Sequence, residues 1–267
     1  MKTYKQVFSE LDRAALIPFF VIGDPDFDTS LAIVKAAIDA GADILELGIP
    51  FSDPIADGPT IQKADIRSMK SGMSVTRALE FIKQIKDYKD IPIGLLMYYN
   101  LIYQYGTEQF FSDFHRAGVN SVLVADLSID DGDEVIGPAA SAGLDTVFMV
   151  TPITELERMK LIASKTTGFI YTVSVLGVTG SRDRLSSAIE ELIGELKKLT
   201  NVPVCVGFGI SKPEHAAAVA RAGADGVIIG SKIVSLIENN LGNTERMKSE
   251  ICDFLCDVKK AVSNHNF

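Results

Sequence analysis

Short apolar segments alternate with longer helical segments along almost the whole chain. Each apolar run is rich in β-branched residues and is followed by a turn rich in Gly, Pro or Asp, a pattern typical of buried strands. The runs cover 17–22, 44–49, 93–99, 121–127, 146–150, 169–173, 202–208 and 226–229. About eight strand-helix units predict an α/β fold, a closed (β/α)8 TIM barrel. A doubly wound open sheet is the alternative, although it commonly has fewer strands.

The segments between the runs have helical periodicity, and they cover 30–40, 64–70, 75–86, 108–117, 134–142, 155–164, 186–199 and 213–222. An Ala-Gly pair ends four of these units, where glycine is expected to cap the helix. No linker interrupts the pattern, so we expect one domain over residues 1–267. We also expect an extra N-terminal helix over 3–13 that plugs one end of the barrel, and an extra C-terminal helix over 244–262 outside it.

The composition excludes several classes of function. A net charge of -9 and a pI near 4.9 argue against a nucleic-acid partner, which would require a basic patch. The N-terminus lacks the apolar core of a signal peptide and no apolar run is long enough to span a membrane, so we expect a soluble, cytoplasmic protein. Cys205, Cys252 and Cys256 form no Cys-x-x-Cys pair and are interpreted as reduced core residues. The three scattered histidines suggest no metal site.

One buried strand carries an unexpected charge. Side chains alternate along the run 44–49, so Glu46 shares a face with Ile44 and Gly48. If the leucines of this run face the helices, Glu46 points into the barrel. Burying a carboxylate costs several kcal/mol even when it is paired, which favours a functional role over a buried ion pair. The loop after the run carries Asp53 and Asp57, and turn formation alone would also explain these two residues.

Active sites of such barrels lie at the carboxyl ends of the strands. Those positions hold carboxylates, tyrosines and glycines but no lysine, which argues against a Schiff-base aldolase. The glycines of 207–209 and Gly230-Ser231 follow the last two strands and favour a phosphate site; tight turns are the alternative. The segment 177–184 has glycines at both ends of its first half and suggests a lid, although a mobile loop would fit as well.

The motif over 45–59, Leu-Glu-Leu-Gly-Ile-Pro-Phe-Ser-Asp-Pro-Ile-Ala-Asp-Gly-Pro, closely resembles the α subunit of tryptophan synthase. Supporting matches lie at 23–25, 98–100, 177–180, 207–210 and 230–231, so the resemblance spans nearly the whole chain. It implies a barrel lyase that cleaves indole-3-glycerol phosphate to indole and glyceraldehyde 3-phosphate. It also implies a β-subunit partner in an αββα heterotetramer. Pyridoxal phosphate is expected in that partner, and no cofactor is expected in this chain.

The resemblance also implies roles for individual residues. The catalytic residues are Glu46, Asp57 and Tyr171; the phosphate-binding residues are Gly180, Gly209, Gly230 and Ser231; the wall of the indole pocket is Phe19, Leu96, Tyr98 and Phe208; and Thr179 lies in the lid. Burial is expected to raise the pKa of Glu46, which would let it exchange protons near neutral pH. Asp57, on a more solvated loop, is expected to stay ionised and to accept the indole N–H.

The resemblance is incomplete near the lid. Many members of the family have an arginine two residues before Gly177, where this chain has Val175-Leu176. The difference bears on coupling to the partner. Three alternatives remain: a stand-alone lyase that releases indole, a weakly active subunit that only activates its partner, and an isomerase of a phosphorylated sugar.

Overall fold

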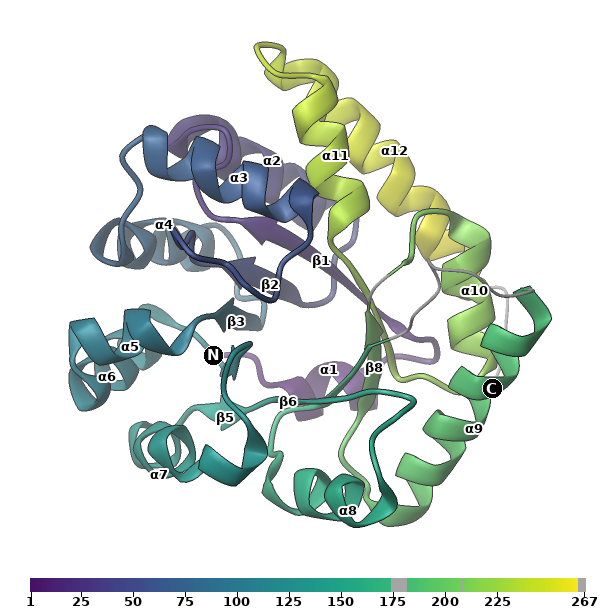
Figure 1. Cartoon of the computed structure of the whole chain (residues 1–267). Helices are drawn as coiled ribbons and strands as arrows, with labels where there is room; N and C mark the ends of the chain where they lie inside the picture. The colour runs from purple at the N-terminus through teal and green to yellow at the C-terminus, as the bar shows by residue number, and fades with distance from the viewer. Residues whose placement is uncertain (174–181, 208, 264–267) are drawn as a thin grey trace.

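The computed structural model describes residues 1–173, 182–207 and 209–263, and Figure 1 shows a central sheet surrounded by helices. Every strand pairing in the sheet is parallel. The strands are β1 (Ala15–Val21), β2 (Leu45–Gly48), β3 (Ile93–Met97), β4 (Ser121–Val124), β5 (Asp145–Thr146), β6 (Phe148–Val150), β7 (Ile170–Val173), β8 (Val204–Gly207) and β9 (Gly226–Ile229).

The sheet closes into a barrel at the position of the fifth strand, which β5 and β6 form together. The strand order runs from β5 through β4, β3, β2, β1, β9, β8 and β7 to β6. Only Val147 separates β5 from β6 along the chain, so these two short strands occupy one position of the barrel. The backbone N–H of Val147 donates to the carbonyl of Val122 at 3.0 Å and continues the pairing across the break. The fold is therefore the predicted (β/α)8 barrel, with its fifth strand split.

Helices cover the outside of the sheet, except the first helix, which lies across one end of it. They are α1 (Tyr4–Glu10), α2 (Phe27–Asp39), α3 (Pro59–Lys70), α4 (Val75–Tyr88), α5 (Tyr99–Tyr105), α6 (Thr107–Ala117), α7 (Asp133–Ala142), α8 (Leu156–Lys165), α9 (Arg182–Leu199), α10 (Pro213–Arg221), α11 (Ser231–Asn239) and α12 (Thr244–Ser263), with a 3-10 turn at Ile129–Asp131. The expected C-terminal helix is α12, which packs against α10 and α2 outside the barrel (Figure 1).

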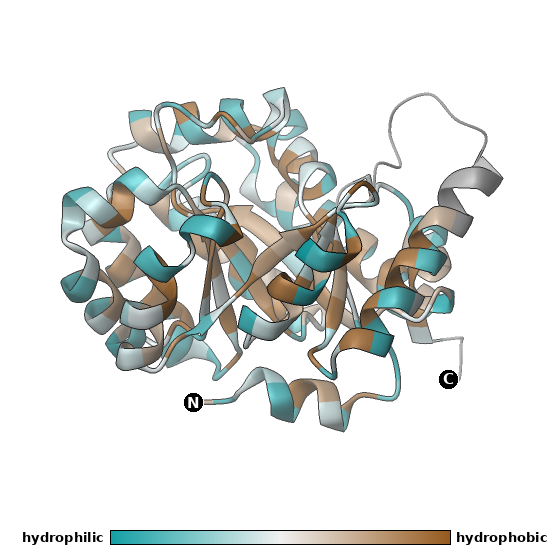
Figure 2. Ribbon diagram, turned by 60° about the horizontal axis from the view of Figure 1, so that its bottom comes forward, coloured by the Kyte–Doolittle hydropathy of each residue, from teal (hydrophilic) through white to brown (hydrophobic). Residues whose placement is uncertain are grey.

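The expected plug is also present. Figure 2 shows α1, the helix next to the N-terminus, at the amino-terminal end of the barrel. Tyr4 and Val7 are buried there, and the Tyr4 hydroxyl lies 2.7 Å from Ser121 Oγ. A Cβ on Gly94 would lie 2.9 Å from the Tyr4 hydroxyl, so this strand residue must be small to admit the plug. With this end closed by α1, ligands must enter from the carboxyl ends of the strands.

The element boundaries differ from the prediction at several places. The third run, expected over 93–99, ends as a strand at Met97, and α5 begins at Tyr99. The fourth run ends at Val124 and the seventh begins at Val204. The predicted Ala-Gly caps are correct: Gly118 and Gly143 have φ of 103° and 85° and end α6 and α7. This left-handed geometry favours glycine because a side chain would strain the backbone.

Candidate active site

Glu46 lies inside the barrel. Its strand pairs with both neighbours so that Glu46 is in register with Phe19 on β1 and Gly94 on β3. Only 3% of its surface is exposed, and Oε2 has no hydrogen-bond partner among the described residues. Burial raises the pKa of this carboxyl to about 8, because a low-dielectric surrounding disfavours the charged form. The inward orientation and the raised pKa were both predicted from the sequence.

Asp57 lies on the loop between β2 and α3, where Tyr98 holds it. The Tyr98 hydroxyl donates to Asp57 Oδ2 at 2.7 Å and accepts the backbone N–H of Ala56 at 3.0 Å. Phe51 stacks on the Tyr98 ring with centroids 5.0 Å apart. Burial raises the pKa of Asp57, while the Tyr98 hydrogen bond acts in the opposite direction. Asp57 itself is thus less solvated than expected, although most of the loop is exposed, and the hydrogen bond from Tyr98 favours the ionised form of Asp57.

Tyr171 projects into the barrel from β7 and is 4% exposed. Burial raises its pKa well above the ordinary value for tyrosine, and the nearby charge of Glu46 adds to the rise. A Cβ on Gly207 of β8 would lie 2.3 Å from the Tyr171 hydroxyl. Glycine at position 207 therefore leaves room for this ring inside the barrel.

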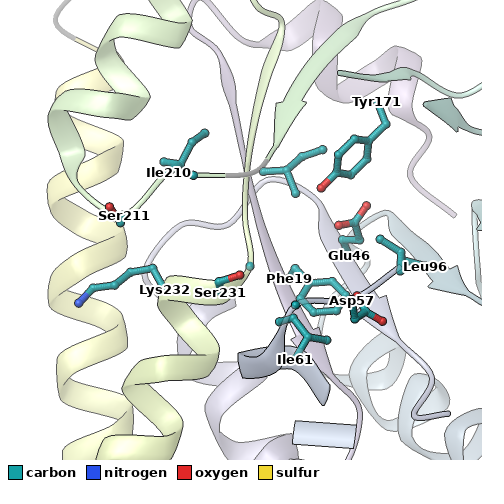
Figure 3. Close-up of a pocket in the computed structure, with 14 residues that line it drawn as sticks. Phe19, Glu46, Asp57, Ile61, Leu96, Tyr171, Ile210, Ser211, Ser231 and Lys232 are labelled. Carbon is teal, nitrogen blue, oxygen red and sulfur yellow. The ribbon is translucent and has the colours of Figure 1, made fainter. Parts of the chain in front are cut away.

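These side chains line one cavity of about 250 Å³, which Figure 3 shows. Glu46, Asp57, Tyr171 and Leu96 lie toward one end, and Ser211, Ser231 and Lys232 lie toward the other. Phe19, Leu96, Ile61 and Ile228 give the cavity apolar walls. The volume lies near the small end of the range for ligand pockets, and apolar walls with a few polar groups are usual for such pockets.

The second end of the cavity has the geometry of an anion site. Gly230 is the N-cap of α11, and Ser231 is its first residue. An α-helix leaves its first N–H groups without intrahelical acceptors, and its dipole favours a negative charge there. Gly209 also lines the cavity, and its φ of 76° favours a residue without a Cβ. Two loops from neighbouring strands, β8 and β9, thus supply backbone groups to one spot.

Most of the predicted site residues come together. Eight of them line the cavity: Phe19, Glu46, Asp57, Leu96, Tyr171, Gly209, Gly230 and Ser231. Tyr98 does not line it but anchors Asp57. Phe208, Thr179 and Gly180, like the departure at Val175-Leu176, fall outside the described residues. Asp53 is exposed on the loop and accepts a hydrogen bond from Ser52.

Sequence reasoning missed several lining residues: Gly58, Ile61, Ile210, Ser211, Ile228 and Lys232. The helical register after Pro59 could have identified Ile61, because it places Ile61 on the same buried face as Ala64. The described residues contain no cluster of three or more His, Cys, Asp or Glu that could hold a metal ion. Among the helices of the described residues, none has the length and hydropathy to cross a lipid bilayer.

Comparisons of the chain with a family model, with known sequences and with solved structures all identify the same family. Residues 6–263 match the family model described as tryptophan synthase alpha chain. The chain is 45% identical over 259 residues to the tryptophan synthase alpha chain of Methanothermobacter thermautotrophicus, covering 97% of this chain and 96% of that one. It is 40% identical over 265 residues to the alpha chain of Salmonella paratyphi B, covering 98% and 99%.

Solved structures with the same fold include subunit alpha of tryptophan synthase from Legionella pneumophila. That chain has a TM-score of 0.91 and 29% identity, with coverage of 99% of this chain and 100% of the other. A chain in the tryptophan synthase α2β2 complex of Pyrococcus furiosus has a TM-score of 0.85 and 37% identity, with coverage of 92% and 98%.

Proposed function

The chain belongs to the tryptophan synthase alpha chain family, and on this basis we propose that it cleaves indole-3-glycerol phosphate to indole and glyceraldehyde 3-phosphate. One observation carries the proposal: two carboxyl groups with different surroundings lie at one end of an apolar cavity whose other end is a helix N-terminus. The indole ring fits the apolar end with its carboxyls, and the phosphate fits the end formed by Gly209, Gly230 and Ser231.

The reaction is a retro-aldol cleavage with two proton transfers. A proton must be added to C3 of the indole, and a proton must leave the hydroxyl group on the side-chain carbon that is bonded to C3. The C–C bond electrons then pass to the ring, and the hydroxyl carbon becomes the aldehyde. Glu46 has a pKa of about 8, so both its forms are populated near neutral pH and it can give one proton and accept another.

Asp57 has a separate role in this mechanism. Protonation at C3 develops positive charge on the ring nitrogen, and a carboxylate that accepts the indole N–H stabilises this charge. The hydrogen bond from Tyr98 favours the ionised form of Asp57 and fixes its direction. Tyr171 lies beside Glu46 in the interior and is proposed to orient the substrate hydroxyl relative to that carboxyl. The phosphate site holds the substrate at a distance from the reacting bond and so supplies orientation.

The partner is a tryptophan synthase β subunit, as in the α2β2 complexes that this chain resembles. Ile55, Tyr103 and Ile153 are 83%, 66% and 92% exposed, and all three follow the carboxyl ends of strands. Large exposed apolar side chains at one end of a barrel are typical of a docking surface. We place the β subunit at this end, where indole leaves the cavity. Pyridoxal phosphate belongs to that subunit, and we assign the reaction to the cytoplasm.

The experiment is product identification. The purified chain is incubated with indole-3-glycerol phosphate, and indole and glyceraldehyde 3-phosphate are quantified separately. Equal amounts of both products are expected, because one C–C bond breaks per turnover. Failure to release indole would instead favour the alternative of a sugar-phosphate isomerase.

A further inference from the structure

A third carboxyl group lies behind the cavity. Asp65 is on α3, eight residues after Asp57, and it is 4% exposed. It shares the buried face of α3 with Ile61, which lines the cavity one turn earlier. Its Oδ2 atom is buried and has no hydrogen-bond partner among the described residues. Burying an ionised carboxylate without a counter-charge costs several kcal/mol of folding free energy, so a role for this carboxyl group is expected.

The groups that face Asp65 do not neutralise it. Asp57 on the loop and Asp24 after β1 are both close enough to raise its pKa by charge repulsion, which adds to the larger effect of burial. Tyr98 after β3 is also within range of the Asp65 charge, but its hydroxyl is bonded to Asp57. The backbone N–H of Phe51 is near enough to Asp65 to favour its ionised form, which acts in the opposite direction. Together these effects raise the pKa of Asp65 to about 8.

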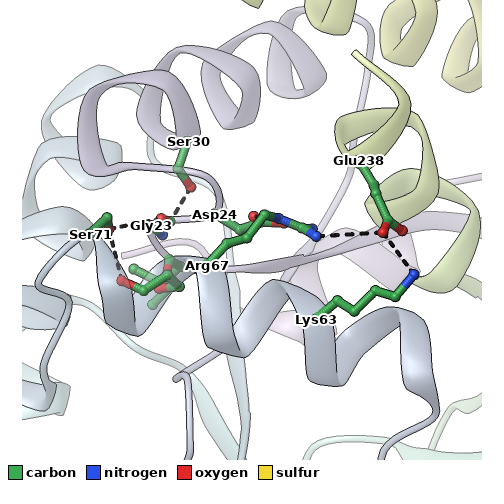
Figure 4. Close-up of polar contacts among 9 residues, drawn as sticks. Gly23, Asp24, Ser30, Lys63, Arg67, Ser71 and Glu238 are labelled. Carbon is green, nitrogen blue, oxygen red and sulfur yellow. Dashed lines mark hydrogen bonds and ion pairs between the residues drawn. The ribbon is translucent and has the colours of Figure 1, made fainter. Parts of the chain in front are cut away.

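Arg67, two residues after Asp65 on α3, pairs with other carboxylates. Figure 4 shows Arg67 directed at Asp24, and the two form a bidentate pair with distances of 2.7 and 2.9 Å. The Asp24 side chain is fully buried, and this pair occupies Nε and Nη2 of the guanidinium group. Glu238 of α11 lies 3.9 Å from Arg67 and accepts a hydrogen bond from Lys63 at 2.9 Å. Arg67 is thus not available to Asp65.

When two carboxyl groups lie close together, ionisation of one raises the pKa of the other, because the two negative charges repel. The one with better donors and more solvent ionises first, and the other keeps its proton. Asp57 is partly exposed and has the Tyr98 hydroxyl as a donor, whereas Asp65 is buried and has an unpartnered oxygen. Asp57 is therefore the ionised member of the pair and Asp65 the neutral one.

We propose that Asp65 is a positioning residue that acts as a neutral acid: it holds Phe51 at the start of the loop and leaves Asp57 as the carboxylate that faces the substrate. The inference rests on the proposed function, because Asp57 is assigned there to the indole N–H. Phe51 stacks on Tyr98, and Tyr98 bonds to both Ala56 and Asp57. Anchoring Phe51 therefore helps to fix the part of the loop that leads to Asp57.

The first test separates Asp65 from Glu46, whose pKa is also about 8. The substitution Glu46→Gln removes turnover and also removes the titrating carboxyl of Glu46. Because the substrate is then not consumed, calorimetry gives the Kd of indole-3-glycerol phosphate. If only the neutral form of Asp65 permits binding, the Kd of E46Q should rise about tenfold between about pH 7 and pH 9. Adding Asp65→Asn should make the Kd independent of pH, whereas adding Asp87→Asn, an exposed control on α4, should leave the rise unchanged.

The second test concerns positioning at constant pH. With Glu46 intact, Asp65→Asn keeps an acceptor for the Phe51 N–H and should keep kcat/KM within about threefold of the parent. Asp65→Leu removes the acceptor and should lower kcat/KM at least about tenfold, which corresponds to the loss of one hydrogen bond. Equal pH dependence in E46Q and its D65N derivative, or full activity of D65L, would overturn the inference alone. No binding at any pH would overturn the proposed function and the inference with it.

Discussion

Glu46→Gln tests the proton-transfer role with little change in shape. Gln cannot give or take the proton, and one acid/base role is worth about 100- to 10,000-fold in rate. We therefore expect cleavage of indole-3-glycerol phosphate to fall at least about 100-fold, measured as indole release under saturating substrate. The exposed Glu157→Gln is the matched control and should keep parental activity. Activity of E46Q within about tenfold of the parent would refute the assignment.

The same substitution should stabilise the fold. When folding raises the pKa of a carboxyl group, the free energy of unfolding falls as the pH rises from the unfolded pKa to the folded pKa. For Glu46 this range extends to about pH 8, and below the unfolded pKa the group has no such cost. With an ordinary value of 4.5 and about 1.4 kcal/mol per pH unit, Glu46 costs up to roughly 3 kcal/mol at pH 7. Gln needs partners for its amide, so the gain should be smaller. Urea unfolding should show E46Q more stable than the parent at pH 7, with the difference shrinking toward pH 5. A difference that does not vary with pH would contradict the buried, unpaired state.

Three other substitutions test separate parts of the site. Tyr98→Phe removes the hydrogen-bond donor to Asp57, so kcat/KM should fall about tenfold. The acidic limb of the pH profile of kcat/KM should also move to higher pH, because the pKa of Asp57 rises. An acidic limb that does not move would count against this role of Tyr98. Gly230→Ala places a Cβ 3.3 Å from the Phe19 ring and should weaken inhibition by inorganic phosphate, whereas Gly137→Ala, whose Cβ meets nothing within 4 Å, should not. Equal inhibition constants would place the phosphate elsewhere. Ile153→Asp should reduce activation by the β subunit without changing the activity of the isolated chain, whereas Leu241→Asp on the loop after α11 should leave activation intact. Loss of activation in both variants would argue against the proposed docking end.

The barrel and part of the candidate site follow from local patterns in the sequence. Alternation along 44–49 is sufficient to place Glu46 inside the barrel, because strand geometry fixes which side chains share a face. The position of the proposed phosphate end follows similarly, since glycines after the last two strands lie at one edge of the sheet. Both predictions depend on residues within a few positions of one strand.

The remaining features depend on long-range contacts. Tyr98 and Asp57 are 41 residues apart, and nothing near either residue indicates that they bond. Asp65 lies in a helix whose other charged residues are partly or fully exposed, and its burial depends on how the loop from Phe51 to Asp57 packs against α3. The helix α5 was missed because its tyrosines favour strand over helix and its N-cap, Tyr98, makes no side-chain cap.

The most direct test of the account is steady-state cleavage of indole-3-glycerol phosphate by the purified chain, alone and with a tryptophan synthase β subunit. We expect weak indole release by the chain alone and a strong increase when the β subunit is added. High activity that the β subunit does not change would instead indicate a stand-alone lyase. No cleavage in either condition would contradict the proposed function of the cavity.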